Sequence, residues 1–484
     1  MAELRVGEGQ QYATLEAAAA AARPGDEVIV HEGVYRETLR PPGGTTWRGA
    51  AGERAIIDGG WSRDHMVDAD AQVNQVLINK PGVTLRGFEI RNVPGKGVAV
   101  AAGGDGFTME GCEIHHTVSG GFAANGTSTL IRNLTIRGCH VHDISMSGIW
   151  RETPVSGCFL FRFCHDVLVE DTEIERGYGE GIAAGVQSVG VTFRRVTVHD
   201  TAHLLMYVSN RAQDVVIEDC ILYQSGLDEF RQGDGDVGAG PVVGDEVGVR
   251  SEGWQHAENV TMRGCLVVNA GSLFGIRNNK KYSGGRPDGY DTTIQNLRVE
   301  RCTFVAGPDT RHGLGLSENP WGHGPVAGII RDCVFVLDRL SAGAAINSDA
   351  SGVQVAGNWW TAGVPAGLPA SNRPMSLAAL VDPLARPASP LNLDNYRPAA
   401  GGPLVDAAGA AVAGALGPAG PTPPPPPPPP PPDPDPEEGP DWAALLELAA
   451  SIGEQLAVAN MAGEAAREAL GELLLRLDEY RVGE

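Results

Sequence analysis

A short pattern of apolar and polar positions recurs along most of the chain: apolar, any residue, apolar, two turn-forming residues, cysteine, any residue, apolar. Because apolar residues alternate at period two, each copy predicts a β-strand and not a helix. The position that cysteine most often takes, called here the ladder position, recurs at steps of 24 to 45 residues. It is filled in turn by Phe88, Cys112, Cys139, Thr172, Val196, Cys220, Cys265, Cys302, Cys333 and Asn358. This recurrence predicts a solenoid in which each unit closes one coil and stacks on the next.

A second strand, opened by small residues, is predicted after each copy of the pattern. The segments are GKGVAV (95–100), SGGFAA (119–124), SGIW (147–150), GEGIAA (179–184) and FGIR (274–277). The combination resembles the repeat of the right-handed parallel β-helix, or pectate-lyase-like, superfamily over residues 1–418. This resemblance implies an all-β solenoid and leaves the function open. The leucine-rich repeat has a similar period but requires its own spacing of Leu and Asn, which is missing here.

Both ends of the predicted solenoid have features of their own. Residues 14–22 predict a short helix with Thr14 as its N-cap, and strands follow in 25–39 and 45–60. This order is similar to the N-terminal cap of the superfamily, whose helix covers the open edge of the first coil. At the other end, residues 391–417 resemble the coil that closes such solenoids.

The composition changes after residue 418. Residues 419–440 form a linker with ten consecutive prolines, which predict a stiff polyproline II spacer of ~30 Å. In 441–484, apolar or small residues recur in an alternating heptad pattern, which predicts a helical segment of coiled-coil type. A single amphipathic helix that docks on another protein is the alternative. We expect this segment to bind a protein partner or to self-associate.

Composition and charge narrow the classes of function. The chain has 484 residues, 42% of them hydrophobic, which is enough for a large core. The net charge of −23 excludes nucleic-acid binding through a global positive field. Six of the eight cysteines occupy the ladder position, which predicts a stack of small buried side chains and not a metal or redox site. No role is assigned to Cys158 or Cys164.

No export or membrane-spanning segment is predicted. Residues 1–20 lack a basic start followed by an apolar stretch, and no apolar run is long enough to cross a membrane. We therefore expect no signal peptide. This pattern favours a cytoplasmic protein, or a virion component that leaves the cell by lysis.

Candidate binding residues follow from the stacking of coils, which lines up outward side chains about 4.8 Å apart. Aligning the second strands at their glycine step predicts two outward rows on one face. The rows are Trp150, Ala183, Met206, Arg250 and Arg277, and Glu152, Gly185, Val208, Glu252 and Asn279. Arginines and carboxylates on one wall, flanked by the longest insertions, suit an acidic sugar chain. Solvated ion pairs are the alternative explanation.

One segment, GDEVGVRSEGWQHAENVTMRGCLVVNAGSLFGIRNNKK (244–281), resembles the catalytic coils of the β-helical alginate and chondroitin lyases. Those enzymes place an acidic pair of calcium ligands before a strand. The resemblance implies that Asp245 and Glu246 are calcium ligands here. It also implies a further ligand, Asn210, on the previous coil.

The chemistry that this resemblance implies is β-elimination. A cation neutralises the uronate carboxylate and acidifies the C5 proton, a base removes that proton, and a proton donor assists the leaving oxygen. Arg277 matches the arginine of these lyases, whereas Arg250 stands where they have lysine. A free guanidinium is a poor base, although related pectate lyases use arginine, and Lys280 lies nearby as a substitute. The predicted substrate-binding residues are Trp150, Glu252, Asn279, Lys281 and Tyr282.

Histidines follow several ladder positions. They are His115, His116, His140, His142 and His199. A metal-binding array and recurrence of the repeat template both account for this spacing, and recurrence is preferred because it requires no further assumption.

Two classes of function remain after these arguments. One is a polysaccharide-binding β-helix displayed on a larger assembly, such as the tail spike of a phage or phage-like particle. The other is a calcium-assisted lyase of an acidic, uronate-containing polysaccharide. The stiff spacer and the heptads favour display.

Overall fold

The computed structural model describes most of the chain up to residue 416. The described residues are 2–62, 73–126, 129–147, 157–231, 235–245, 256–278, 293–316, 326–341, 344–347, 352–405, 411 and 413–416. The predicted linker and the predicted helical segment at 441–484 lie outside them. Within these ranges, no helix has the length and apolar character needed to span a membrane.

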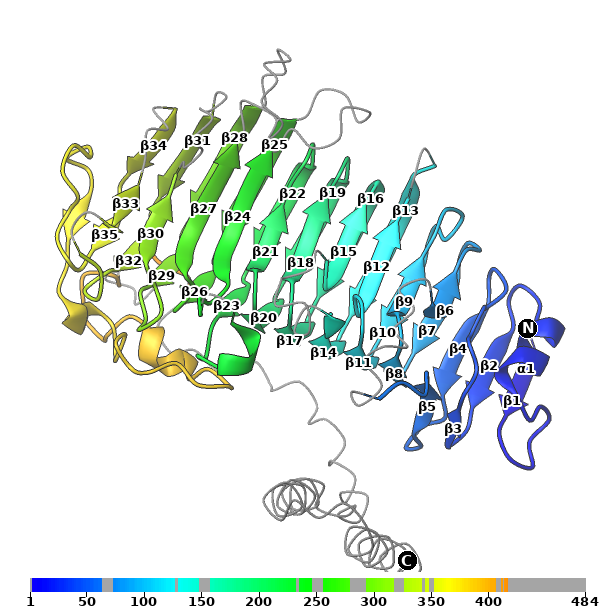
Figure 1. The fold of residues 1–484 in the computed structure, drawn as a ribbon. Helices are drawn as coiled ribbons and strands as arrows, with labels where there is room; N and C mark the ends of the chain where they lie inside the picture. Colours follow the sequence, from blue (N-terminus) through cyan, green and yellow to red (C-terminus); the bar gives the residue numbers. More distant parts are fainter. Residues whose placement is uncertain are drawn as a thin grey trace, which may run out of the picture. The chain divides into compact units, whose positions relative to one another are not determined.

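The described residues form a solenoid of three parallel sheets, called sheets A, B and C here (Figure 1). Sheet A consists of β1 (Glu3–Val6), β2 (Glu27–Val30), β4 (Thr46–Gly49), β7 (Thr84–Arg86), β10 (Thr108–Glu110), β13 (Ile131–Arg137), β16 (Cys164–Glu170), β19 (Val189–Arg194), β22 (Gln213–Glu218), β25 (His256–Arg263), β28 (Thr293–Glu300), β31 (Val326–Arg331) and β34 (Val353–Ala356).

Sheets B and C complete each coil. Sheet B consists of β3 (Gly33–Tyr35), β5 (Ala55–Asp58), β8 (Phe88–Val93), β11 (Glu113–Thr117), β14 (His140–Ile144), β17 (Glu173–Gly177), β20 (Thr197–Thr201), β23 (Ile221–Tyr223), β26 (Leu266–Val268), β29 (Thr303–Val305), β32 (Val334–Val336), β35 (Trp359–Trp360) and β36 (Arg373–Pro374). Sheet C consists of β6 (Asn74–Ile78), β9 (Lys96–Val100), β12 (Phe122–Asn125), β15 (Phe159–Arg162), β18 (Glu180–Gly185), β21 (Leu204–Val208), β24 (Ala239–Asp245), β27 (Ser272–Asn278), β30 (His312–Gly315) and β33 (Ile346–Asn347). A short 3-10 helix, η2 (Asp228–Phe230), follows β23.

The recurring sequence pattern spans two strands and the corner between them, where we expected one strand. In the copy at 83–92, β7 ends at Arg86, Gly87 has a φ of 62°, and β8 begins at Phe88. The residue before each ladder position has a left-handed φ of 50° to 72°: Gly87, Gly111, Gly138, Asp171, Arg195, Asp219, Gly264, Arg301, Asp332 and Gly357. The left-handed residue turns the chain into the next sheet and is an extra position in the alternation, since Leu85 and Phe88, three residues apart, both point into the core.

The predicted ladder is confirmed by the register of sheet B. Glu113 pairs with Glu89 on one side and with His140 on the other, so Cys112 stacks between Phe88 and Cys139. The same register continues to the last strands of the sheet, and every side chain at the ladder position is at most 3% exposed. All eight cysteines are free and buried, as expected for small core side chains.

The ladder ends in a buried amide. Asn358 is fully buried, its Oδ1 accepts the backbone N–H of Cys333 at 3.0 Å, and its Nδ2 donates to the carbonyl of Ile330 at 2.9 Å. The Asn358 side chain therefore satisfies backbone groups that would otherwise be buried without partners at the last coils.

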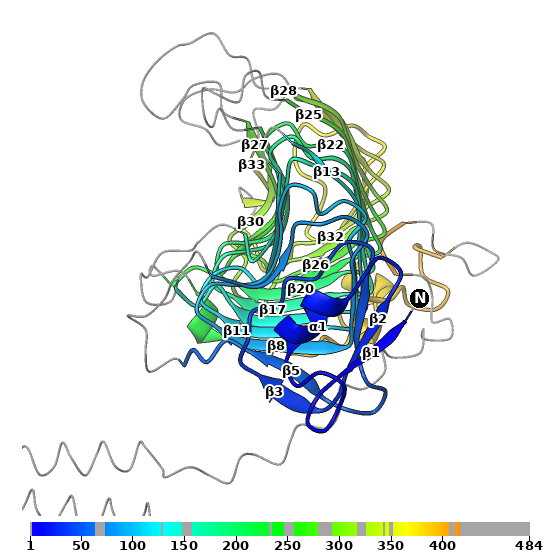
Figure 2. The same ribbon diagram turned by 90° about the vertical axis from the view of Figure 1, so that its right-hand side faces the viewer.

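The predicted N-terminal helix is confirmed as α1 (Leu15–Ala21), which lies at the N-terminal end of the solenoid (Figure 2). The hydroxyl of Thr14 accepts the N–H of Ala17 at 3.1 Å, as an N-cap does. The carboxylate of Glu37 accepts the N–H groups of Leu15 and Glu16. The buried side chains of this helix join the interior core and cover the first coil.

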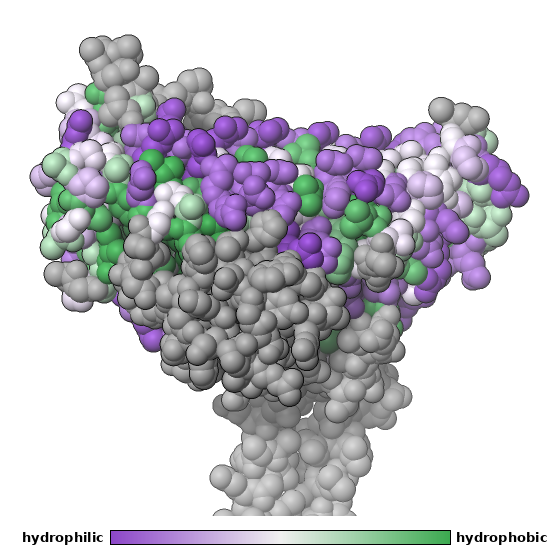
Figure 3. Space-filling model, turned by 90° about the horizontal axis from the view of Figure 1, so that it is seen from above, coloured by the Kyte–Doolittle hydropathy of each residue, from purple (hydrophilic) through white to green (hydrophobic). Residues whose placement is uncertain are grey.

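Arginine and glutamate alternate along one outward row of sheet A. The row runs Arg86, Glu110, Arg137, Glu170, Arg194, Glu218, Arg263, Glu300 and Arg331. Neighbours form ion pairs such as Arg86 to Glu110 at 2.6 Å and Arg137 to Glu170 at 2.6 Å. Figure 3 views the solenoid from above relative to Figure 1, and hydrophilic residues cover much of the coloured surface in that view. Each exposed pair contributes little energy, but a one-residue slip would break the whole row, which specifies the register.

The segment from residue 375 to 416 does not close the end of the solenoid, which corrects our expectation for 391–417. It contains η5 (Leu377–Ala379) and η6 (Leu393–Tyr396) and packs on the outer face of sheet B (Figure 1). The contact is apolar because the outward residues of the C-terminal strands are apolar. This cluster contains Tyr223, Leu266, Val268, Val305, Val334, Val336, Met375, Leu380, Tyr396 and Leu404.

Candidate functional site

The outward rows of sheet C differ from the rows that we predicted. Ala183 pairs with Leu160 and Tyr207, and not with Trp150 and Met206. The strand of this coil is β15, which begins after the insertion at 148–156, so SGIW does not supply it. Met206 is fully buried and belongs to the interior core.

The second predicted row is also out of register. Val208 pairs with Ala184 and Val243 and points into the core, at 1% exposure. The strand that stacks beneath β27 is β24, which ends at Asp245, before Arg250 and Glu252 begin. The glycine step that we used for alignment therefore did not give the register of sheet C, on β21 or on the coils before and after it.

Arg277 is an exposed residue of β27 whose strand partner is Gly244. Extending the pairing of sheet C places Gly185, Ser209 and Gly244 on one outward row with Arg277. Arg162 pairs with Gly185 and so lies on the same row. Four coil steps separate the two arginines, which corresponds to ~19 Å at ~4.8 Å per step.

The structure brings two of the predicted calcium ligands to adjacent coils. The backbone N–H of Asn210 donates to the carbonyl of Gly244 at 3.2 Å, which places Asn210 beside Asp245. Asp245 pairs in turn with Asn278, the residue that follows Arg277. The backbones of Asn210, Asp245 and Arg277 therefore lie at one edge of sheet C.

The other predicted site residues lie outside the described residues. They are Trp150, Glu246, Arg250, Glu252, Asn279, Lys280, Lys281 and Tyr282. Their roles stay predictions.

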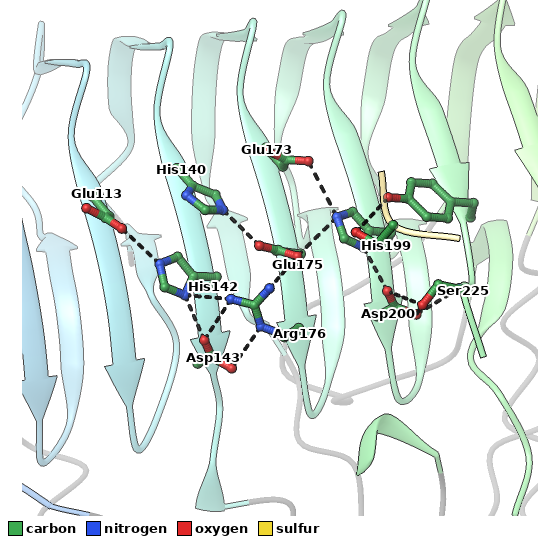
Figure 4. A network of polar contacts seen from close by, with 12 residues as sticks. Glu113, His140, His142, Asp143, Glu173, Glu175, Arg176, His199, Asp200 and Ser225 are labelled. Atoms are coloured by element: carbon green, nitrogen blue, oxygen red, sulfur yellow. Dashed lines mark hydrogen bonds and ion pairs between the residues drawn. The ribbon is translucent and has the colours of Figure 1, made fainter. Parts of the chain in front are cut away.

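A second polar constellation lies on the outer face of sheet B, in its N-terminal half (Figure 4). Two rows of outward side chains follow the ladder position, one residue and three residues after it. The first row is Glu89, Glu113, His140, Glu173 and Thr197, and the second is Arg91, His115, His142, Glu175 and His199. The pairing of strands thus brings the histidines into contact with carboxylates from neighbouring coils.

The contacts run diagonally from one coil to the next. His115 Nε2 lies 3.3 Å from a Glu89 oxygen, and His142 Nε2 lies 3.1 Å from a Glu113 oxygen. On the following coils, His140 Nε2 lies 2.9 Å from Glu175, and His199 Nε2 lies 3.4 Å from Glu173 (Figure 4). This array supplies paired imidazoles and carboxylates, the groups that hold protons or metal ions.

His199 is the most enclosed histidine of the array, at 1% exposure. Its Nδ1 lies 2.8 Å from Asp200, and the ring stacks on Tyr223 with centroids 4.4 Å apart. Burial alone would lower the pKa of His199, but the contacts with Asp200, Glu173 and Glu175 outweigh it and raise the pKa to about 9. His199 is therefore an imidazolium ion at neutral pH.

The same arrangement surrounds His142. Its Nδ1 lies 2.7 Å from Asp143, whose carboxylate accepts two hydrogen bonds from Arg176 at 3.0 and 2.9 Å. Burial opposes the charge of His142, but the bonds to Asp143 and Glu113 raise its pKa. Burial likewise opposes ionisation of Glu175, yet its contact with His140 and the nearby cations lower its pKa to about 2.

Sequence reasoning treated these histidines as recurrence of a template and did not pair them with carboxylates. The signal was present in the first and third positions after the ladder residue, where Glu and His exchange places from copy to copy. Reading the copies against one another at those positions would have paired Glu113 with His142 and Glu173 with His199.

A family model described as the right handed beta helix region matches residues 74–254. Together with the three stacked parallel sheets, this match decides the fold. The protein is a right-handed parallel β-helix. The predicted all-β, right-handed parallel β-helix is thus confirmed as the fold. No curated protein gives a significant match to this β-helix.

Solved structures similar to this β-helix include enzymes and a tailspike. Pectate lyase Pel9A is 13% identical, with a TM-score of 0.49 over 87% of this chain and 97% of that chain. The A-module of mannuronan C-5 epimerase AlgE4 from Azotobacter vinelandii is 15% identical, with a TM-score of 0.44 over 70% and 93% of the two chains. The Dettilon tailspike protein is 11% identical, with a TM-score of 0.39 over 74% and 63%. These likenesses concern the fold alone.

Proposed function

We propose that this β-helix recognises an acidic polysaccharide along the outer face of sheet C, at the edge where β15, β21, β24 and β27 end. The observation that carries the proposal is the single outward row that holds Arg162 and the exposed Arg277. A polymer with a repeating carboxylate suits a wall whose positions also repeat, and a guanidinium binds a carboxylate through two parallel hydrogen bonds.

Small residues separate the two arginines on this row: Gly185, Ser209 and Gly244. Gly244 leaves room for the ring of Tyr207, since a Cβ at Gly244 would lie 2.8 Å from the Tyr207 hydroxyl oxygen. The net charge of −23 offers no general attraction for a polyanion, so binding would depend on these local cations.

Binding is tested with Arg277→Ala and with Arg298→Ala as the matched control. Arg298 is exposed on sheet A, where its Nε donates to Asn296, so the control removes one arginine from another face. We expect the wild type to bind alginate or polygalacturonate and not neutral dextran, and Arg277→Ala to bind about tenfold to a hundredfold more weakly, the loss of one charge-assisted contact. Equal affinities for the two variants, or no preference for uronates, would contradict the proposal.

A second candidate function, calcium-assisted β-elimination, is favoured by the adjacency of Asn210 and Asp245 beside Arg277. Amide and carboxylate oxygens on neighbouring strands fit Ca²⁺, which accepts oxygen ligands at ~2.3–2.6 Å in flexible geometry. Asn210, Asp245 and Glu246 would hold the ion, which would neutralise the uronate carboxylate. Arg277 would orient that carboxylate, and Arg250 or Lys280 would remove the C5 proton.

The two functions are distinguished by the products. A lyase releases chain ends with the ultraviolet absorbance of an unsaturated uronate, and EDTA abolishes that release. Asp245→Asn should raise the calcium concentration that activity requires, and Arg277→Ala should abolish turnover. Binding without new chain ends favours recognition alone.

The proposal extends to display on a larger assembly, such as a phage-like particle, through residues 441–484. The heptad pattern of this segment and the stiff linker before it support this part. Deleting 441–484 should change the oligomeric state or abolish incorporation into the particle, measured by light scattering after gel filtration. An unchanged oligomeric state and unchanged incorporation would contradict display.

A further inference from the structure

Four imidazole rings gather on two adjacent strands of sheet B, away from the face considered above. His115 and His142 pair on β11 and β14, and their rings are stacked with centroids 4.8 Å apart and planes 3° apart. His140 lies 4.4 Å from His142, and His116 lies 4.9 Å from His115 by the same measure. The spacing follows from strand pairing, which holds side chains on neighbouring coils in register.

One carboxylate faces two of these rings. Glu113 is on β11 with His115, and its Oε1 lies 3.1 Å from His142 Nε2. One ligand atom from each of Glu113, His115 and His142 lies within 4.8 Å of the other two. Among the residues that the structure describes, this trio is the one such group of three metal-ligating side chains. We propose that Glu113, His115 and His142 form a Zn²⁺ site on the outer face of sheet B.

The residues around His142 are placed to orient its ring as a zinc ligand. A metal-bound histidine usually donates its other ring N–H to a carboxylate, which fixes the tautomer and raises the basicity of the ligand. His142 Nδ1 contacts Asp143 at 2.7 Å, and Arg176 holds that carboxylate from the next coil. Nε2 of His142 is then the nitrogen that points at Glu113 and at the metal position.

The environment of His115 also suits a metal. Its Nδ1 lies 2.7 Å from His116 Nδ1, and its Nε2 lies 3.3 Å from Glu89. The rings of His115 and His116 meet edge to face, with planes 78° apart. The imidazole–carboxylate donor set matches Zn²⁺, whereas Ca²⁺ and Mg²⁺ prefer oxygen ligands alone.

The geometry requires a small closure. Tetrahedral zinc with bonds of ~2.1 Å places its ligand atoms ~3.4 Å apart, closer than the widest separation in the trio. The side chains of Glu113, His115 and His142 are 34%, 15% and 11% exposed, so Glu113 is the most accessible of the three and is the one whose rotation would bring about the closure. Three protein ligands leave a fourth position for water or for a group of a ligand.

The other histidines of the array lack this convergence. His199 Nε2 faces the carboxylates of Glu173 and Glu175, and the ring is covered by Tyr223. Carboxylates and a phenol ring, and not a second imidazole, therefore surround His199. His140 Nε2 points at Glu175, away from Glu113. The trio at β11 and β14 is the place where a second imidazole replaces a second carboxylate.

The test is a titration of the tag-free, full-length protein with Zn²⁺ by calorimetry, and with Co²⁺ by visible absorption, at about pH 8, above the ordinary pKa of imidazole. We expect one ion per chain and the intense visible bands of tetrahedral Co²⁺. His142→Asn and Glu113→Gln should each weaken binding at least tenfold, and Asp143→Asn should weaken it about tenfold to a hundredfold through its contact with His142. The matched control is His165→Asn, a histidine of sheet A near Arg132, which should leave affinity unchanged.

The outcomes decide the proposal in either direction. No stoichiometric zinc binding, equal affinity in His142→Asn and the wild type, or an octahedral Co²⁺ spectrum would overturn it. Glu113 is the most exposed of the three ligands, so Glu113→Gln keeps the test decisive should His142→Asn fail to fold, as monitored by circular dichroism. This result is independent of glycan binding, because the site lies on sheet B and the proposed glycan face is on sheet C.

Discussion

Replacement of His199 by glutamine tests whether the buried imidazolium of sheet B stabilises the fold. The ring of His199 contacts Asp200 on its own strand, Glu173 and Glu175 from the preceding coil, and Tyr223 from the following coil. These are the titratable groups that face it. Glutamine keeps one hydrogen-bond donor and removes the positive charge from among three carboxylates.

The magnitude follows from the pKa of His199. The folded-state pKa of about 9 lies above the ordinary value of 6.5, so protonation stabilises the folded state. This stabilisation is fully present below the unfolded-state pKa and is lost as the pH rises through the folded-state pKa. A rise from 6.5 to about 9 corresponds to about 3 kcal/mol, of the order of one buried, hydrogen-bonded charge pair.

The assay is urea unfolding followed by tryptophan fluorescence, in steps between about pH 6 and about pH 10, where only the protonation of His199 within its cluster should change. We expect the wild type to exceed His199→Gln by about 3 kcal/mol in free energy of unfolding at the acidic end, and the difference to shrink as the pH rises past about 9. The control is His312→Gln, an exposed histidine on β30, whose difference from wild type should stay small and flat. A difference for His199→Gln that is constant or grows with pH would refute the reasoning.

Three further predictions concern the core and its cover. Asn358→Ala leaves the backbone groups of Cys333 and Ile330 without their buried partners and should lower the free energy of unfolding in urea by about 3 kcal/mol. Gln354→Ala, on the exposed face of β34, should change that free energy by less than about 0.5 kcal/mol, and equal costs would contradict the role of the Asn358 amide. The native protein should resist iodoacetamide at all eight buried thiols, and mass spectrometry should show eight modified sites only after unfolding; modification of a ladder cysteine in the native state would contradict the buried stack. Tyr396→Ala should cost about 3–5 kcal/mol and increase the binding of a hydrophobic dye, because Tyr396 is 1% exposed where the C-terminal segment packs on sheet B; unchanged dye binding would contradict this packing.

The ladder could be predicted because one physical rule governs it. Residues such as Cys112 and Cys139 must be small and apolar to stack in the interior, and this requirement repeats in the sequence with every coil. The N-terminal helix was also predictable, since Thr14 is a favourable N-cap residue and most residues of the helix are alanines. These features depend on local sequence, and the structure confirms them.

The division of the repeated pattern into one strand of sheet A and one strand of sheet B could not be predicted in the same way. The corner before each ladder residue is left-handed, and Asp171 or Arg195 at that corner reads as an ordinary strand residue. The register of sheet C was hidden by insertions, which shifted the strand of one coil to β24 and left Arg250 beyond its end. Register across long loops depends on pairing between coils, and the chain order alone does not state it.

The packing of the C-terminal segment on sheet B could have been predicted from the outward residues of the strands that it covers. Strands such as β26 and β32 are apolar on both faces, as in Leu266, Val267 and Val268, and a strand of this kind predicts a covered outer face. The histidine array was missed for a related reason. Its partners lie one coil apart, so they are separated by more than twenty residues in the sequence and become neighbours only when the coils stack.

The fold-back of residues 375–416 decides how the molecule would bear a pulling force. The backbone N–H of Ala415 donates to the hydroxyl of Thr303 at 2.9 Å, so the last described residues are anchored to the flank of β29 and not to the tip of the stack. Tension applied from the C-terminal side would first have to strip Tyr396 and Leu404 from sheet B before it could unwind a coil. A force from the C-terminal side would thus act first on the flank of the β-helix and not on its terminal coil.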